Sequence, residues 1–269
     1  SAASDVYKRQ AEEGRAFDEV LQEAQRLGYA EANPTADVEG YDAMYKLSIL
    51  SSLAFHAHMP IDAIYREGIT KLTAEDFEAA ELLGYEIKLL AIGKKNGHAI
   101  EVRVHPTMVP KAHPLASVRG VFNAIFLTGH AVGDVMLYGR GAGCMPTASA
   151  VMSDVIYACH AAGRHRYTTF RNEAGMSEEI ELVRDFSCIY CVRLSVHDAP
   201  GTMAAIAAVF ARHGVSLKDV LQLGERAGGS SHITFMTHTA HELSVQAALD
   251  EIRGLPCVHS VESVIRAEA

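Results

Sequence analysis

The chain lacks the features that mark membrane proteins and nucleic-acid-binding proteins. It has no apolar run of about 18 residues, so no transmembrane helix is expected. Basic residues (24) are fewer than acidic residues (33), and the formal charge of −9 argues against a surface that binds nucleic acid or an anionic membrane. Residues 1–10 also lack the apolar core of a secretory signal peptide. These absences favour a cytoplasmic protein.

Cysteine is scarce, and its pattern argues against disulfides and metal sites. Five cysteines in 269 residues is an odd count, which is typical of reduced thiols in the cytosol. The Cys-x-x-Cys pair, Cys188 and Cys191, lies in a strand-like run, where positions three apart face opposite sides. The 14 histidines are scattered, and His56 and His58 have the wrong spacing for one helix face. We therefore expect no metal or dithiol site.

The first part of the chain predicts an α+β fold, a mixed β-sheet covered by helices. Residues 1–10 have no apolar period and are interpreted as a foreign or artefactual leader, after which helical spacing runs from Ala11 to Gly28. Strand-like alternation flanks Asn96-Gly97, which is a strong hairpin signal. Segments predicted as strands are 85–91, 100–104, 121–128 and 134–138, and Pro106, Pro110 and Pro114 predict a loop.

The last part, 187–269, predicts a separate small domain with the order βαββαβ, which is the ferredoxin-like arrangement. A polar segment at 164–176 is interpreted as a linker. Within the small domain, a loop precedes the first helix, and a loop at a helix N-terminus can hold the polar ends of a small ligand. The loop consists of Asp198, Ala199, Pro200 and Gly201.

The most informative stretch is 29–50, which combines several carboxylates with one cation, Lys46. Helical spacing is predicted from Tyr41 to Phe55. Asp42 and Lys46 are four residues apart and share one helix face, which also carries leucines. Because a buried charge is costly unless it is paired, we expect an Asp42–Lys46 pair within a buried apolar stripe.

Two interpretations of this pair are open from the residues alone. The pair is either a structural bridge that fixes the end of the helix, or a lysine adjusted by burial that acts as a general acid or base. Two more acids upstream, Glu31 and Asp37, favour the second interpretation, because one lysine does not need three acids for neutrality. Spare carboxylates in a cleft could hold the ammonium group of a substrate.

A glycine cluster, 139–143, precedes a predicted helix, so its backbone N–H groups could meet a cofactor phosphate. The cluster is not the G-x-G-x-x-G fingerprint that opens a βαβ unit, and a tight strand-to-helix turn explains it equally well.

Two long motifs resemble homoserine dehydrogenase. The first is Gly28-Tyr-Ala-Glu31 with the run from Pro34-Thr-Ala-Asp37 to Lys46, and the second joins Phe122-Asn-Ala-Ile125 to residues 133–151. The tail resembles an ACT domain, and the resemblance covers about residues 11–269. It implies reversible NAD- or NADP-dependent conversion of L-aspartate 4-semialdehyde to L-homoserine, in threonine, methionine and isoleucine biosynthesis.

The resemblance also implies roles for individual residues. Lys46 matches the proton donor and acceptor at the substrate oxygen, and Asp42 matches the acid that positions the substrate and this lysine. Substrate-binding positions are Glu31, Asp37 and Asp42; cofactor contacts are Gly28, Gly141, Ala142 and Gly143; no metal ligand is implied in this chain. The ACT-like loop 198–201 is the expected effector site, with threonine as the expected amino acid.

The chain departs from the family pattern because the N-terminal dinucleotide-binding domain is absent. We therefore expect a fragment of a longer reading frame, without turnover on its own. Asn33 and Arg140 replace the usual aspartate and proline. The expected division is a leader (1–10), an incomplete catalytic domain (11–143), a helix returning to the missing domain plus a linker (144–186), and an ACT domain (187–269).

A different class of protein also fits the tail. On this alternative the chain is a non-catalytic, amino-acid-binding regulatory module, and the Asp42–Lys46 pair is structural. In both cases a homodimer or higher homo-oligomer is expected, since ACT-like sheets would otherwise leave their edge strands exposed.

Overall fold

A computed structural model of the chain describes residues 34–120, 122–161, 181–226 and 230–268. The predicted leader 1–10, the predicted helix from Ala11 to Gly28 and the predicted linker 164–176 lie outside the described residues. None of the described helices is long and apolar enough to cross a membrane.

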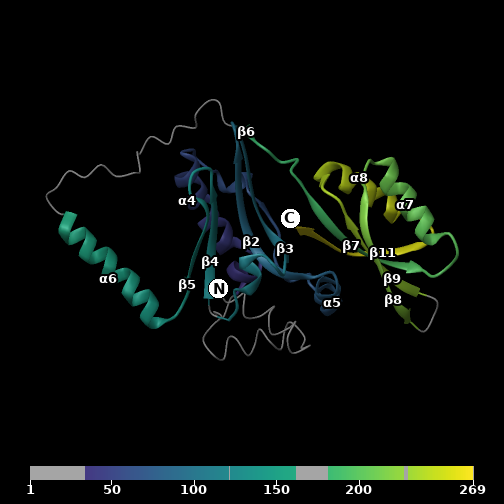
Figure 1. Cartoon of the computed structure of the whole chain (residues 1–269), viewed down its shortest axis with the longest axis horizontal. Helices are drawn as coiled ribbons and strands as arrows, with labels where there is room; N and C mark the ends of the chain where they lie inside the picture. The colour runs from purple at the N-terminus through teal and green to yellow at the C-terminus, as the bar shows by residue number, and fades with distance from the viewer. Residues whose placement is uncertain (1–33, 121, 162–180, 227–229, 269) are drawn as a thin grey trace.

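The first part of the described chain is a helix-covered sheet with a long hairpin at its centre (Figure 1). Its elements are α3 (Thr35–Val38), α4 (Tyr41–Phe55), η1 (Ile61–Ala63), β1 (Tyr65–Arg66), α5 (Ala74–Leu82), β2 (Tyr85–Asn96), β3 (Ala99–Pro110), η2 (Pro114–Ser117), β4 (Phe122–Gly129), β5 (Gly133–Arg140) and α6 (Cys144–Ala161).

The second part has the predicted βαββαβ order, with two very short strands added. Its elements are β6 (Glu181–Leu182), β7 (Ser187–His197), α7 (Thr202–Arg212), β8 (Leu217–Arg226), β9 (Ser230–Thr237), β10 (Ala240–His241), α8 (Glu242–Arg253) and β11 (Val258–Ala267). The four main strands lie in the order β11-β7-β9-β8 and are antiparallel, which confirms the ferredoxin-like prediction.

The two parts share one sheet, which the sequence did not predict. In the described part of the chain, nine strands form a sheet in which β11 joins the small domain to β3 of the first part. The junction is parallel and short, with Arg266 opposite Thr107 and Ala267 opposite Met108. Strands β4 and β5 form a separate two-stranded sheet. The α+β prediction is confirmed, but the two parts are more closely joined than a linker model suggests.

The β2–β3 hairpin confirms the turn signal and corrects the predicted loop that follows. Asn96 pairs with Ala99, and the turn between them uses Gly97 at φ +61°, where a side chain would be strained. Strand β3 then continues through Pro106, which lies opposite Leu89, so the predicted loop is wrong there. On its other edge, β3 pairs with β1 up to Val104 and with β11 from Thr107. Pro106 lies in the gap between these two partner strands, so its missing N–H group costs no hydrogen bond to either of them.

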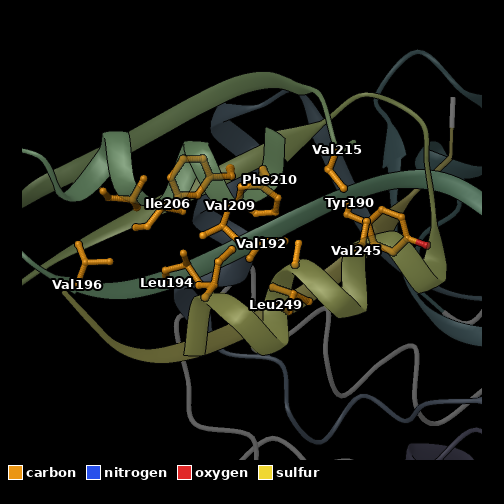
Figure 2. Close-up of a cluster of buried hydrophobic side chains, with 14 of the residues drawn as sticks. Tyr190, Val192, Leu194, Val196, Ile206, Val209, Phe210, Val215, Val245 and Leu249 are labelled. Carbon is orange, nitrogen blue, oxygen red and sulfur yellow. The ribbon is translucent and has the colours of Figure 1, made fainter. Parts of the chain in front are cut away.

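Buried side chains form three clusters in the described residues. One lies between the ACT-like sheet and the helices α7 and α8, where Val192, Leu194, Val209, Phe210 and Leu249 converge (Figure 2). A second lies beneath α4. The third combines residues of both parts. Cys188 belongs to the first cluster and Cys191 to the third, which confirms that this pair faces opposite sides of its strand.

Candidate active site

The helix α4 carries the two central candidate residues, and a glycine sets where it starts. Gly40 is its N-cap, with φ +77°, a left-handed conformation that favours glycine. A Cβ atom built at Gly40 would lie 3.3 Å from the Val104 side chain, so the start of the helix is also close to β3. The short helix α3 leads directly into this turn, because the Gly40 amide donates to the Asp37 carbonyl at 3.1 Å.

The inner face of α4 consists of Met44, Leu47 and Ser51, which are buried against the β2–β3 hairpin. A small residue on the sheet allows this close packing. A Cβ at Gly93 would lie 2.7 Å from the Ser51 hydroxyl oxygen and 3.6 Å from a Leu47 methyl. The absence of a side chain at Gly93 therefore leaves room for Ser51 and Leu47 to pack against β2.

Asp42 and Lys46 form the predicted pair, but the pair is not buried. The Lys46 Nζ atom donates to Asp42 Oδ2 at 2.7 Å, while the two side chains are 59% and 37% exposed. The expected burial is wrong for this structure, and the reason is geometric. Helix α4 has apolar residues on two faces, and the sheet covers the face of Met44 and Leu47.

The second apolar face of α4 is therefore open, and it surrounds the lysine. Tyr45, Ile49 and Leu50 are all exposed, with Ile49 at 57%. A contiguous apolar surface with a charged pair in it is typical of a face that another protein element or a ligand covers. The ammonium group of Lys46 is accessible on this face and is held in one direction by Asp42.

The upstream acids have different surroundings. Glu39 is occupied by structural contacts, because its carboxylate accepts a hydrogen bond from Thr70 at 2.9 Å and lies 3.7 Å from the Arg66 guanidinium. Asp37 belongs to α3, immediately before the buried Val38. Glu31 and Gly28 lie outside the described residues.

The glycine segment 141–143 joins β5 to the 18-residue helix α6 and is exposed. Gly143 has φ +122°, and a Cβ on Gly141 would lie 1.8 Å from the Asn123 amide nitrogen, so both positions exclude larger residues. Arg140, just before, places its guanidinium 5.3 Å from the Phe122 ring centroid. In the described residues, no hydrogen bond or ion pair joins this segment to α4.

The helix α6 stands apart from both sheets (Figure 1). Its large apolar side chains are exposed, and Met145 is 77% exposed. The exposed set also includes Val151, Met152, Val155, Ile156 and Tyr157.

The predicted effector loop lies where the sequence places it. Gly201 caps α7 with φ +93°, and Thr202 donates through its hydroxyl to the His197 carbonyl at 2.9 Å. Asp198 and Pro200 are exposed, and Ala199 is half-buried. The loop therefore presents an accessible N-terminus of an 11-residue helix.

A cluster of buried charges, which was not predicted from the sequence, lies where the two parts of the chain meet. Arg103 and Arg266 are almost fully buried, and both guanidinium groups lie over the Phe186 ring, at 4.4 and 5.6 Å. Arg103 donates to Glu268 at 2.6 Å and pairs with Glu101. The signal in the sequence was the occurrence of charged residues within strand-like runs. Because arginine is seldom buried without a partner, an arginine in such a run indicates a buried ion pair.

Burial shifts the pKa values in this cluster. Burial alone raises the pKa of the Glu242 carboxyl, but the hydrogen bonds and charge of Arg266, with help from Tyr190, hold it below its ordinary value. Burial, together with the Cys188 thiol and Glu242, raises the pKa of the Tyr190 phenol. Glu242 is therefore an anion, and Tyr190 a neutral donor to it, at 2.8 Å.

A pocket of about 650 Å³ opens beside the first turn of α4 and reaches the segment that enters β7. Its aromatic lining comes from both parts of the chain and includes Tyr41, Tyr45, Tyr65 and Phe186. The pocket faces the side of α4 that carries Tyr41 and Tyr45 and does not include Asp42 or Lys46.

Comparison with known proteins finds a matching family for each part of the chain. The family model described as homoserine dehydrogenase matches residues 3–156, and the ACT domain model matches residues 192–257. Homoserine dehydrogenase of Neisseria gonorrhoeae is 40% identical over 269 residues, and that of Synechocystis is 42% identical over 274 residues. The alignments cover 98% and 97% of this chain but 62% of each relative.

Solved structures agree with the sequence relatives. The crystal structure of a homoserine dehydrogenase from Thiobacillus denitrificans has a TM-score of 0.89 at 38% identity and covers 99% of this chain and 62% of its own. A Staphylococcus aureus homoserine dehydrogenase gives 0.73 at 28% identity, covering 100% and 63%. The chain that carries the open face of α4, the glycine segment before α6 and the ACT domain therefore belongs to the homoserine dehydrogenase family.

Proposed function

We propose that this chain forms the substrate-binding and regulatory part of an NAD(P)-dependent homoserine dehydrogenase, which interconverts L-aspartate 4-semialdehyde and L-homoserine. The observation that carries the proposal is the Asp42–Lys46 pair, 2.7 Å apart on an open face, in a chain of this family. The match of the catalytic family over residues 3–156 favours this function over a stand-alone ACT module. The chain spans 62% of the length of the relatives, so the complete reaction is assigned to a protein of their length.

The proposed roles follow from the charge that develops during the reaction. Hydride addition to an aldehyde builds negative charge on its oxygen, which a nearby ammonium group stabilises and then protonates. Lys46 supplies that group, and Asp42 holds it in position through the 2.7 Å hydrogen bond. We assign Glu31, Asp37 and Asp42 to the binding of the substrate's polar groups, including its ammonium.

A nicotinamide cofactor, NADP or NAD, supplies the hydride when it is bound. The local structure fits a contact with such a group. Gly141, Ala142 and Gly143 expose their backbone directly before the N-terminus of α6, where peptide N–H groups favour an anion. We assign these three residues, with Gly28, to the cofactor site, and we infer that the exposed apolar side chains of α6 pack on a dinucleotide-binding domain.

The remaining proposals concern assembly, regulation and location. The exposed apolar side chains of the β4–β5 hairpin, such as Leu127 and Leu137, support a homodimer or higher homo-oligomer. The loop 198–201 supports an amino-acid effector, with threonine as the candidate. Five free cysteines and a biosynthetic reaction support a cytoplasmic location.

The proposal is tested by Lys46→Ala in the protein extended at its N-terminus to the length of its relatives. We expect kcat for homoserine oxidation to fall by a factor of about 10²–10⁴, the range for a general acid or base, while the KM for homoserine changes little. Lys71→Ala, at an exposed lysine in the same part of the chain, serves as the matched control and is expected to keep its rate. A Lys46→Ala enzyme with the rate of the control would refute the assigned role.

A further inference from the structure

One arginine of the ACT domain holds together residues from both parts of the chain. The Arg266 guanidinium binds Glu242 of α8 through two hydrogen bonds, from Nε at 2.9 Å and from Nη2 at 2.8 Å. It also donates to Glu67 at 3.0 Å and to the Tyr65 hydroxyl at 2.9 Å, both in the first part of the chain. Its side chain is only 2% exposed. A planar, fully charged fork of this kind fixes geometry as well as charge.

The residues that Arg266 binds in the first part belong to a segment that supports the start of α4. Strand β1 contains Tyr65 and Arg66, and the Arg66 guanidinium lies 3.7 Å from the Tyr41 ring centroid and donates to the Glu39 carbonyl. Two residues further on, Gly68 has no room for a side chain, since a Cβ there would lie 2.6 Å from the Val38 carbonyl oxygen. The β1 segment is thus in direct contact with residues 38–41.

A second set of contacts reaches the same residues through the apolar core. Val38 is buried in the cluster shared by both parts, together with Ile69 of the first part and Met236 and Ile265 of the ACT domain. The Ile69 amide donates to the Val38 carbonyl at 2.8 Å. The residue next to Asp37 is therefore packed in a core that the ACT domain helps to build.

We propose that Arg266 is a positioning residue for the substrate site: by binding Glu67 and Tyr65, it holds the β1 segment that sets the position of Asp37 and of the first turn of α4. The link from Arg266 to the substrate site rests on the proposed function. The restraint of residues 35–47 by Arg266 does not depend on that function. The ACT domain is then part of the scaffold of the substrate site, and a change in β11 alters that site directly.

A second buried ion pair between the two parts provides a matched control. Arg193 of β7 is 5% exposed and donates to Asp76 of α5 at 2.9 Å and to Thr73 at 2.8 Å. It has the same chemistry and burial as Arg266 and crosses the same boundary. Its partners lie on α5 and not on β1, so its loss removes a comparable interaction without releasing the β1 segment.

The test is amide hydrogen exchange on the chain itself, comparing Arg266→Met with Arg193→Met. Three amides report on the segment: Glu67, which donates to Val104 at 2.8 Å; Ile69; and Met44, which donates to Gly40 at 3.0 Å. In Arg266→Met we expect exchange at these amides to become about tenfold faster, a typical size for coupling between sites, and in Arg193→Met to stay within about twofold of the original chain. Equal acceleration in both variants, or none in Arg266→Met, would overturn the proposal.

A milder variant keeps the test decisive if Arg266→Met fails to fold. Glu67→Gln removes one charge from a side chain that is 39% exposed, so the fold is expected to survive. We expect it to accelerate exchange at Ile69 and Met44 by a smaller factor, about threefold, in the direction of Arg266→Met. Unchanged exchange at both amides in Glu67→Gln would count against the proposal.

Calorimetry with L-homoserine then separates this inference from the proposed function. If the original chain binds homoserine, we expect the Kd to rise about tenfold in Arg266→Met, to stay near the original value in Arg193→Met, and to recover in part in Arg266→Lys, which restores the charge without the fork. An unchanged Kd in Arg266→Met would refute the positioning role. If the original chain binds no homoserine, the substrate assignment fails in this chain, and the exchange comparison alone decides whether Arg266 restrains residues 35–47.

Discussion

A histidine in the middle of the sheet should make the stability of this protein depend on pH between 5 and 7. His105 lies in β3 with no exposed surface. Its Nε2 atom accepts a hydrogen bond from Arg103 Nε at 3.0 Å, so the ring proton is on Nδ1, which donates to the Pro106 carbonyl at 2.9 Å. Burial, then the positive charge of Arg266 and Arg103, lowers the pKa of His105 to about 3.

The direction of the effect follows from linkage. In the unfolded chain His105 takes up a proton near its ordinary pKa of 6.5, whereas in the folded chain it stays neutral down to about pH 3. Its contribution to stability is therefore complete above about pH 6.5 and is lost as the pH falls. The full difference of roughly 3.5 pKa units corresponds to about 5 kcal/mol, and the part lost between pH 7 and pH 5 is about 2 kcal/mol.

Urea unfolding at pH 7 and pH 5 measures this loss. The carboxyl of Glu242, an acid on α8 that acts on His105, has a depressed pKa, so its own contribution to stability is lost at more acid pH. His105→Gln keeps an acceptor for Arg103 but cannot be protonated, so we expect it to lose about 2 kcal/mol less than the original chain over this interval. His58→Gln, at an exposed position, is the control and should behave like the original chain. Equal losses in His105→Gln and the original chain would refute the reasoning.

Two further predictions concern stability and are checked by circular dichroism during urea unfolding, since the chain has no tryptophan. Asp76→Ala leaves the Arg193 guanidinium buried without its carboxylate and also removes the capping box of α5, so we expect the free energy of unfolding to fall by about 3–5 kcal/mol. Arg193→Met should cost less, because Asp76 keeps hydrogen-bond donors from Thr73 and Ser263. Equal losses in the two variants would contradict this. Phe210→Ala should cost about 3–5 kcal/mol, because its buried ring packs 5.6 Å from that of Phe235, and a loss below about 1 kcal/mol would show that the site collapses around the change.

Local sequence signals predicted those features whose cause is local. The helix from Tyr41 to Phe55 and the turn at Gly97 each depend on neighbouring residues and a preferred backbone conformation. The order of the ACT domain was predictable for the same reason. The Asp42–Lys46 pair was predictable from its four-residue spacing.

The exposure of that pair was not predictable, because the packing of α4 depends on contacts with residues elsewhere in the chain. Both apolar faces of α4 look equally suited to a core from the sequence, and the face that packs on the sheet does so where Gly93 of β2 leaves room for Leu47 and Ser51. Strand β3 gave a similar error, since Pro106 ends a strand in most contexts but here meets a gap between β1 and β11. Both errors arise where a long-range contact outweighs a local preference.

The same long-range contacts explain why arginines occur in strands that otherwise look like core. The β3–β11 junction pairs only two residues on each strand, too few to set its own register. Arg266 adds a requirement that apolar side chains cannot add, because it must reach Glu242 and Glu67 at once. A buried ion pair contributes little net stability, but a misaligned one leaves a charge buried and unpaired, which is costly. The buried arginines therefore favour one alignment of the ACT domain on the first part of the chain, and the positioning role proposed for Arg266 depends on that alignment.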